Sequence, residues 1–208
     1  MATLGTLRTT IARELQLDAT TDATDIDRAI FSAVAFYNDE DFWFLETSPA
    51  LVTLSSTTQY ALLTVLPDRS QIFTVSLHIN QSKSEMHFRT LEEMLELEYD
   101  TDFAGEPLYW SIFNDQLMIL PRPNRTYTAE VHYSLRRSMT ASASASSVWT
   151  NEAEELIRLH AMADLQENRL KDFQAAVQTK ARLKLEVLPM LHKKTVARKR
   201  SSRIKPFM

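Results

Sequence analysis

Residues 108–120 are Leu-Tyr-Trp-Ser-Ile-Phe-Asn-Asp-Gln-Leu-Met-Ile-Leu. Two short apolar runs flank the pair Asn114-Asp115, and both of these residue types tolerate the positive φ angles of a tight turn. The pattern therefore predicts an antiparallel β-hairpin near the middle of the chain. Other short apolar or alternating runs extend the β-rich region to either side, at 51–55 and 59–65 (expected to form a second hairpin), 72–79 and 127–135.

The chain on the N-terminal side of this region has helical periodicity. Leu4, Leu7, Ile11 and Leu15 recur at helical spacing and predict an amphipathic helix over residues 4–17. A second helix follows, with Thr24 or Asp25 as its expected N-cap, and leads into an aromatic cluster at 42–44.

The C-terminal side predicts the longest helix, from about Glu152 to Leu188. Thr150 or Asn151 is its expected N-cap, and Pro189 is expected to end it. Inside the β-rich region, Thr90 with Glu93 three residues later has the pattern of a capping box and predicts a short helix.

We therefore expect an α+β fold, in which the N-terminal helices and the long C-terminal helix form a helical bundle that carries a small antiparallel β insertion. A basic C-terminal arm is expected to be extended. The expected segments are N-terminal helices at 1–48, the β-rich insertion with its short helix at 49–138, a flexible Ala/Ser loop at 139–150, the long helix at 151–189 and the basic docking arm at 190–208.

Charge is divided unevenly along the chain. The last nineteen residues carry seven basic side chains and no acidic one, whereas the other 189 carry sixteen basic and twenty-seven acidic side chains. The body therefore has a formal net charge of −11 and the tail one of +7. Seven like charges cannot lose their hydration in a protein core. The apolar side chains at the end of the tail predict docking on a partner, through Lys193, Lys194, Arg198, Lys199, Arg200, Arg203, Ile204, Lys205, Pro206, Phe207 and Met208.

The tail has two other interpretations. Its basic residues could bind nucleic acid or a membrane surface, or the tail could be a solubilising terminus. The apolar tip favours a docking strand that becomes ordered on assembly. The acidic body argues against nucleic-acid binding by the folded part, because phosphate contact requires a basic surface.

Several classes of site lack their sequence signatures. The chain has no cysteine, which excludes thiolate chemistry and suits reducing cytoplasm, and its two glycines are too few for a phosphate-binding loop. No histidine motif has the spacing of metal ligands, and His78 and His132, both in expected strands, are predicted to be paired or exposed. We therefore predict no catalytic, cofactor-binding or metal-binding residue, no membrane span, and a protein that is not an enzyme.

The order of these elements resembles a known family. Residues 25–30 and 37–46 in the N-terminal helices, Pro107-Leu108-Tyr109-Trp110 followed by a turn and Leu117 to Pro123, the strand at 127–133 and the long helix with its basic extension occur in the order found in the head-to-tail adaptor proteins of tailed bacteriophages. These connector or neck proteins lie directly beneath the portal. The resemblance covers nearly the whole chain.

The resemblance implies a structural role in the virion. It implies a homo-oligomeric ring, commonly twelvefold, that binds the portal protein, seals or extends the DNA channel and receives the next tail or nozzle component. DNA would pass through the lumen without specific binding, no membrane would be involved, and the protein would lie in the neck of the virion after assembly in the host cytoplasm. The alternative is a small DNA-binding or regulatory protein that uses the basic arm, while a tail-associated hydrolase would need paired carboxylates that no spacing specifies.

Overall fold

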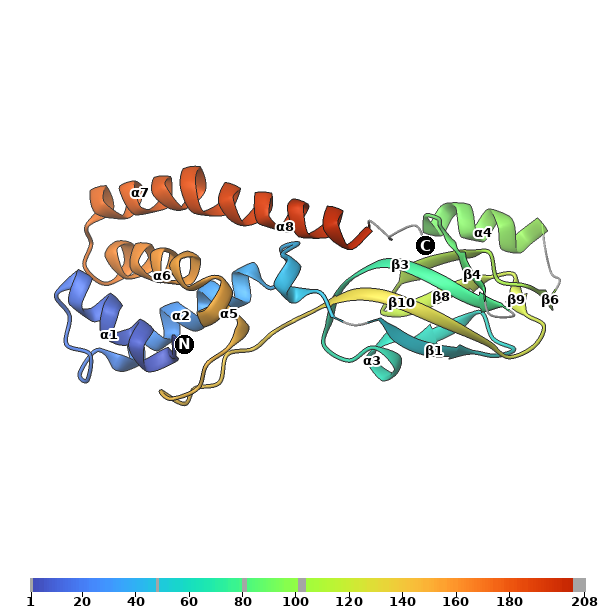
Figure 1. Ribbon diagram of the computed structural model, residues 1–208, viewed down its shortest axis with the longest axis horizontal. Coiled ribbons are helices and arrows are strands. Elements are labelled where there is room, and N and C mark those ends of the chain that lie inside the picture. The colour runs from blue at the N-terminus through green and yellow to red at the C-terminus, as the bar shows by residue number, and fades with distance from the viewer. Residues whose placement is uncertain (1, 48, 80–81, 101–103, 204–208) are drawn as a thin grey trace. The chain divides into compact units, whose positions relative to one another are not determined.

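The chain folds into two compact units. The computed structural model (Figure 1) describes residues 2–47, 49–79, 82–100 and 104–203. Residues 1–45 and 137–208 form the helical unit, and residues 46–136 form the β unit. The α+β class is confirmed. In the part of the chain that the structure describes, no helix is both long and apolar enough to cross a membrane.

The helical unit is made from both ends of the chain. Its elements are α1 (Leu4–Leu15), α2 (Ala23–Tyr37), the 3-10 turn η1 (Trp43–Leu45), α5 (Val148–Glu152), α6 (Glu154–Asn168), α7 (Phe173–Arg182), the π-helical segment η2 (Leu183–Val187) and α8 (Leu188–Arg203). All of them except α7 contribute side chains to one apolar core, and α7 buries Ala176. Within this unit α6 contacts α2 on one side and α7 on the other (Figure 1).

Trp149 is a large side chain of the helical core. Its side chain is fully buried, and its ring packs edge-on against Phe44 with the ring centroids 5.2 Å apart. The indole Nε1 donates a hydrogen bond to the carbonyl oxygen of Arg137 at 2.7 Å. The polar end of this large side chain therefore keeps a partner inside the core.

The expected helix from Glu152 to Leu188 is wrong as a single helix. It is divided between α5 and α6 at Ala153 and again by a turn at 169–172, after which α7 folds back onto α6. Lys171 has a φ of 57°, a left-handed conformation that usually falls to Gly or Asn. The Asp172 side chain then accepts a hydrogen bond from the Ala175 N–H at 3.0 Å and caps α7.

Pro189 does not end the C-terminal helix. It occupies the second position of α8, directly after the π-helical segment, and the helix continues to Arg203. A proline lacks a backbone donor, and a position at the beginning of a helix or beside a π-bulge needs none. The expectation of an extended arm from Met190 is therefore wrong for residues 190–203, whereas Ile204, Lys205, Pro206, Phe207 and Met208 lie outside the described residues.

The Ala/Ser loop is attached to the first helix. The backbone N–H groups of Leu4 and Gly5 donate to the carbonyl oxygens of Ala145 and Ala143, at 3.2 and 2.9 Å. These N–H groups have no partner inside α1, so the loop satisfies them. A Cβ on Gly5 would lie 2.9 Å from the Ala143 oxygen, which explains the glycine at that position. Helix α5 then begins after Ser147, which accepts from the Thr150 N–H and is its cap.

The β unit contains two four-stranded sheets. Their strand orders are β1-β10-β3-β4 and β2-β8-β7-β5. The elements are β1 (Ala50–Leu54), β2 (Gln59–Ala61), α3 (Leu62–Val65), β3 (Arg69–Ile79), β4 (Ser82–Glu85), β5 (His87–Phe88), α4 (Leu91–Asp100), β6 (Ala104–Gly105), β7 (Tyr109–Phe113), β8 (Gln116–Leu120), β9 (Arg122–Pro123) and β10 (Tyr127–Leu135). Both sheets contribute side chains to one core.

The central hairpin is confirmed. Strands β7 and β8 pair antiparallel with Phe113 opposite Gln116, and the turn residues Asn114 and Asp115 have φ angles of 48° and 57°. The run Leu117 to Leu120 is continuously apolar because both of its faces are covered. Leu117 and Ile119 enter the core that both sheets share, while Met118 and Leu120 pack with Met94 of α4.

Two details of the β unit differ from the expectation. Residues 51–55 and 59–65 do not form a hairpin, because β1 pairs with β10, β2 pairs with β8, and residues 62–65 are helical. The β unit also includes two short parallel pairs, β5 with β7 and β6 with β9. The capping box at Thr90 is confirmed, since its N–H donates to the Glu93 carboxylate at 2.9 Å and its Oγ1 accepts from the Glu93 N–H.

Candidate docking site at the C-terminal helix

Helix α8 is held on the helical unit by one buried face. Leu191 and Thr195, four residues apart, are 2% and 3% exposed. The Thr195 hydroxyl donates to the Leu191 carbonyl oxygen at 3.0 Å and accepts from the backbone N–H of Trp43 at 3.4 Å. A polar side chain is tolerated in this interface because its oxygen has both a donor and an acceptor role there.

Aromatic side chains of residues 42–43 extend this contact along the helix. The guanidinium of Arg198 lies 4.9 Å from the centroid of the Trp43 ring, at the distance of a cation–π interaction. The rings of Phe42 and His192 are 5.4 Å apart, and the His192 Nε2 lies 4.0 Å from the Glu40 carboxylate. The aromatic cluster that the sequence placed after the second helix therefore supports α8 as far as Arg198.

The residues predicted to dock on a partner consequently fall into three groups. Lys193 and Lys194 are exposed on α8, and Arg198 is packed against Trp43. Lys199, Arg200 and Arg203 belong to the last turns of α8. The apolar tip at 204–208 lies outside the described residues. The described contacts between α8 and the body extend as far as Arg198.

A pocket opens beside the middle of the helical unit. Its volume is about 490 Å³, and side chains of α2, α6, α7, η2 and α8 line it, including Phe36, Tyr37, His160, Lys184 and Leu188. Burial raises the pKa of Tyr37 to about 12, with a further contribution from Glu40, and burial lowers the pKa of His160. The neutral pair is joined by a contact of 3.1 Å between the Tyr37 hydroxyl and the His160 Nδ1. Local sequence patterns cannot reveal this pair, whose members are 123 residues apart.

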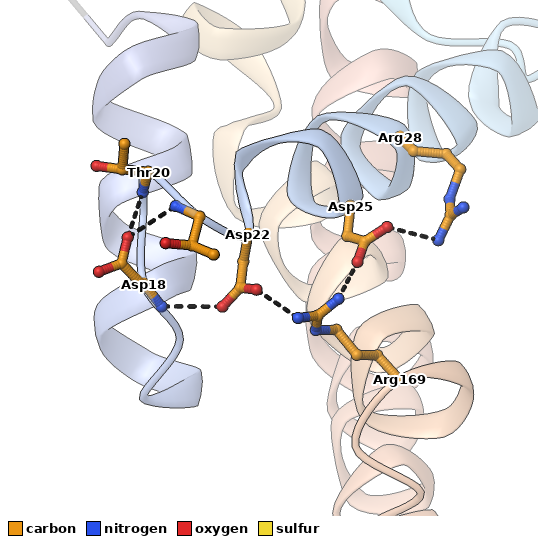
Figure 2. Close-up of polar contacts among 7 residues, drawn as sticks. Asp18, Thr20, Asp22, Asp25, Arg28 and Arg169 are labelled. Atoms are coloured by element: carbon orange, nitrogen blue, oxygen red, sulfur yellow. Dashed lines mark hydrogen bonds and ion pairs between the residues drawn. The ribbon is translucent and has the colours of Figure 1, made fainter.

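Ion pairs fasten the loop before α2 to the end of α6 (Figure 2). Arg169 binds the carboxylates of Asp22 and Asp25, and Arg28 lies 3.1 Å from Asp25. Hydrogen bonds from the Thr21 and Thr20 N–H groups lower the pKa of Asp18. The expected cap at Thr24 or Asp25 is wrong, since α2 begins after Asp22, whose carboxylate accepts from the Asp18 N–H at 3.0 Å and binds Arg169.

The β unit contains a buried carboxylate surrounded by a lysine and two histidines. The Glu130 side chain on β10 is 9% exposed and accepts hydrogen bonds from Lys83 at 2.6 and 2.7 Å. The Nε2 atoms of His78 and His132 each lie 3.0 Å from it. The prediction that these histidines are paired or exposed is therefore confirmed. Hydrogen bonds from Lys83 and His78 lower the pKa of Glu130 to about 2.

The Glu130 cluster predicts a loss of stability in acid. Because the folded-state pKa of about 2 lies below the ordinary value of 4.5, the folded protein binds fewer protons than the unfolded chain between these values. This stabilisation is present above about pH 4.5 and is lost as the pH falls towards 2. We expect Glu130→Gln to lower the free energy of unfolding by about 1–3 kcal/mol near neutral pH.

Urea unfolding of the wild type and the variant near pH 5 and near pH 3 measures this effect. The difference between the two proteins should shrink at the lower pH. Glu85→Gln is the matched control, since Glu85 is an exposed carboxylate on β4, the strand that also carries Lys83. An equal difference at both pH values would show that the charge of Glu130 is not the source of the stability.

Comparison with known proteins bears on the identity of the chain. No curated protein matches the sequence. The family model described as SU10 adaptor protein matches residues 2–205, nearly the whole chain. The match confirms the resemblance to the head-to-tail adaptor proteins of tailed bacteriophages. The chain therefore belongs to the SU10 adaptor protein family, a family of structural phage adaptor proteins.

Proposed function

We propose that this adaptor forms a ring beneath the portal of a tailed phage capsid, where it seals or extends the DNA channel and provides the platform for the next tail component. Family membership supports the adaptor role. The observation that carries the proposal is the basic helix α8. It contacts the helical unit through the hydrogen bond between Trp43 and Thr195, and its last turns contain Lys199, Arg200 and Arg203.

The docking arm in this proposal is shorter than residues 190–208. Contacts to the helical unit hold α8 as far as Arg198. The segment after Arg198 contains four of the seven basic side chains and the whole apolar tip. Its positive charges would meet an acidic surface on the portal, and Ile204, Phe207 and Met208 would fill apolar pockets there.

The charge of the remaining chain suits a DNA passage. The body has a formal net charge of −11 and would repel the phosphates of DNA that slides through a ring, so DNA would not be held in the lumen. A neck position in the virion and a twelvefold ring that matches the portal belong to the same proposal.

Electron microscopy of portal rings mixed with the full-length chain tests the proposal directly. The portal protein comes from the same phage genome, and added ring density at one end of the portal is the expected result. Unchanged portal rings at saturating adaptor concentration would refute the portal role. If the chain instead binds DNA with a steep salt dependence that resides in the tail, the DNA-binding alternative holds.

A further inference from the structure

The sheet β1-β10-β3-β4 ends in two open edges. Strands β1 and β4 lie on opposite sides of β10 and β3 (Figure 1), and β1 pairs with β10 while β4 pairs with β3. In the part of the chain that the structure describes, the backbone of neither edge strand is hydrogen-bonded to any other segment. Each edge therefore presents unpaired N–H and C=O groups, to which a further strand can be added.

The two edges differ in how well they are protected. Natural edge strands avoid unwanted pairing by means of charged side chains, prolines or bulges. Strand β4 contains Lys83 and Glu85, both exposed. Strand β1 is Ala-Leu-Val-Thr-Leu, pairs with β10 over all five residues without a bulge, and exposes 67% of Leu51. The β1 edge thus has the composition of an internal strand.

The directions of the strands make the two edges complementary. Each of the three strand pairs in this sheet is antiparallel, so β1 and β4 run in opposite directions. When β4 of one copy lies beside β1 of a second copy in the same orientation, the new pair is also antiparallel. Because the sheet has an even number of strands, this alternation continues unbroken from each copy to the next.

The side chains at the two edges also allow this pairing. Across the sheet, Val52 is in one row with Ala129, Leu77 and Ser84, and the first three of these belong to the apolar core. On the core side, β4 therefore offers a small serine to the neighbouring β1. Its charged residues, Lys83 and Glu85, alternate with the serines and point to the other face. Pairing of β4 with β1 therefore buries no charge against the core.

The outer face has a row of its own that reaches both edges. Leu51, Glu130, Ser76 and Glu85 lie opposite one another in the four strands, so Leu51 and Glu85 are the two ends of this row. In a sheet that continues into the next copy, Glu85 would lie beside the neighbour's Leu51 or one register step away. Cross-strand neighbours of this kind have Cβ atoms about 5–8 Å apart.

We propose that β4 of one copy adds to β1 of the next copy, so that β1-β10-β3-β4 continues around the ring as one antiparallel sheet. A contact between two different edges is heterologous and generates a ring when the rotation closes. It also satisfies both open edges, whereas two-fold pairing of β1 with β1 stops at a dimer. This inference rests on the proposed ring and names the strands that close it.

The small size of the contact favours a closed ring over a free dimer. A pair of strands with five and four residues buries less than the roughly 1,200 Å² that a stable two-protein complex needs. One such contact is therefore weak between free chains. In a closed ring each copy makes the contact twice, once through β1 and once through β4, so we expect the pairing to be most complete on the portal.

The chain offers a direct test because it contains no cysteine. Leu51→Cys marks the β1 edge and Glu85→Cys marks the β4 edge, each in a separate full-length chain. Both positions are exposed, so both variants are expected to fold. Phe113→Cys, at an exposed position of β7 in the other sheet, is the control for random collisions. A short bis-maleimide crosslinker is added to each variant alone and to pairwise mixtures, free in solution and with portal rings.

We expect a covalent dimer on a denaturing gel from the mixture of Leu51→Cys and Glu85→Cys, with more product on portal rings than in solution. Either variant alone, or either mixed with Phe113→Cys, should give little product. A chain with both edge substitutions should give a ladder of dimers, trimers and larger species. Thr53→Cys in place of Leu51→Cys repeats the test further along β1. Equal product from Leu51→Cys alone, or no crosslink in either state, would overturn the proposal.

Hydrogen–deuterium exchange distinguishes strand pairing from mere proximity. Amide groups at the open edges of β1 and β4 should exchange several-fold more slowly in assembled rings than in the free chain, because each becomes hydrogen-bonded to a neighbouring copy. The amide groups that already face β10 and β3 should change little. Crosslinks between the two edges with unchanged exchange in both strands would show that the edges lie close together without pairing, which contradicts the proposal.

The outcomes separate this inference from the proposed function. If the chain adds a ring to the portal but the β1 and β4 cysteines never crosslink, the portal role stands and the edge pairing is wrong. If the crosslinked ladder forms and the portal stays bare, the edge pairing is right and the portal role fails.

Discussion

Trp149→Ala should lower the free energy of unfolding by about 3–5 kcal/mol, the range found when a buried aromatic side chain is truncated. Trp149 is fully buried and packs edge-on against Phe44. Removing it leaves a cavity between α5 and η1, and it also leaves the Arg137 carbonyl oxygen without the indole donor. Urea unfolding followed by circular dichroism measures the change.

Trp149→Phe separates the two contributions. This variant keeps a buried aromatic ring but removes the Nε1 hydrogen bond and part of the indole, so it should cost less than Trp149→Ala, about 1–3 kcal/mol. Phe173→Ala is the surface control, because Phe173 is exposed on α7, and it should change the stability of the free chain little. A Trp149→Ala protein as stable as the wild type would show that this core does not depend on the indole.

The second large effect concerns the docking arm. Removing residues 199–208 is expected to abolish attachment to the portal and to leave the body folded. The contacts of Thr195 and Arg198 with Trp43 remain in this truncated chain. A cut at Thr195 would remove both contacts as well, so it would mix a loss of stability with a loss of docking. Co-sedimentation with portal rings measures attachment, and thermal unfolding checks the body.

Two finer variants separate charge from apolar contact within the arm. Phe207→Ser with Met208→Ser should weaken attachment by a few kcal/mol, as expected when two large apolar side chains are no longer buried. Replacing Lys199, Arg200 and Arg203 with Ser should weaken attachment most at low salt, because the lost attraction is electrostatic. Attachment of the truncated chain at wild-type strength would contradict the docking role.

Sequence patterns predicted the local features of the fold with few errors. The turn at Asn114-Asp115, the capping box at Thr90 and the first two helices depend on neighbouring residues, so a short window contains the information. The resemblance to phage adaptors, confirmed by the family match, came from the order of such windows along the chain.

The errors occurred where distant parts of the chain override local preference. Lys171 takes a left-handed conformation that its residue type disfavours, because α7 turns back onto α6, where Ala176 is buried and the following Leu183 enters the core. Pro189 lies in a helix because the preceding π-helical segment accommodates its missing donor. The Asp22 carboxylate binds Arg169, 147 residues away, and makes no capping hydrogen bond at the start of α2.

Some features of the candidate sites can likewise be predicted from the sequence, and others depend on the folded structure. The basic tail and its excess of positive charge are visible in the amino-acid order alone, since charge is a property of composition. The residue at which the arm begins depends on how far α8 is held on the helical unit. One of the contacts that hold it joins Thr195 to Trp43, which lie 152 residues apart in the sequence. The pairing of His78 and His132 with Glu130 likewise arises from packing. Patterns of neighbouring residues specify turns, caps and net charge because these are local quantities; the partners of a side chain are set by contacts that exist only once the chain has folded.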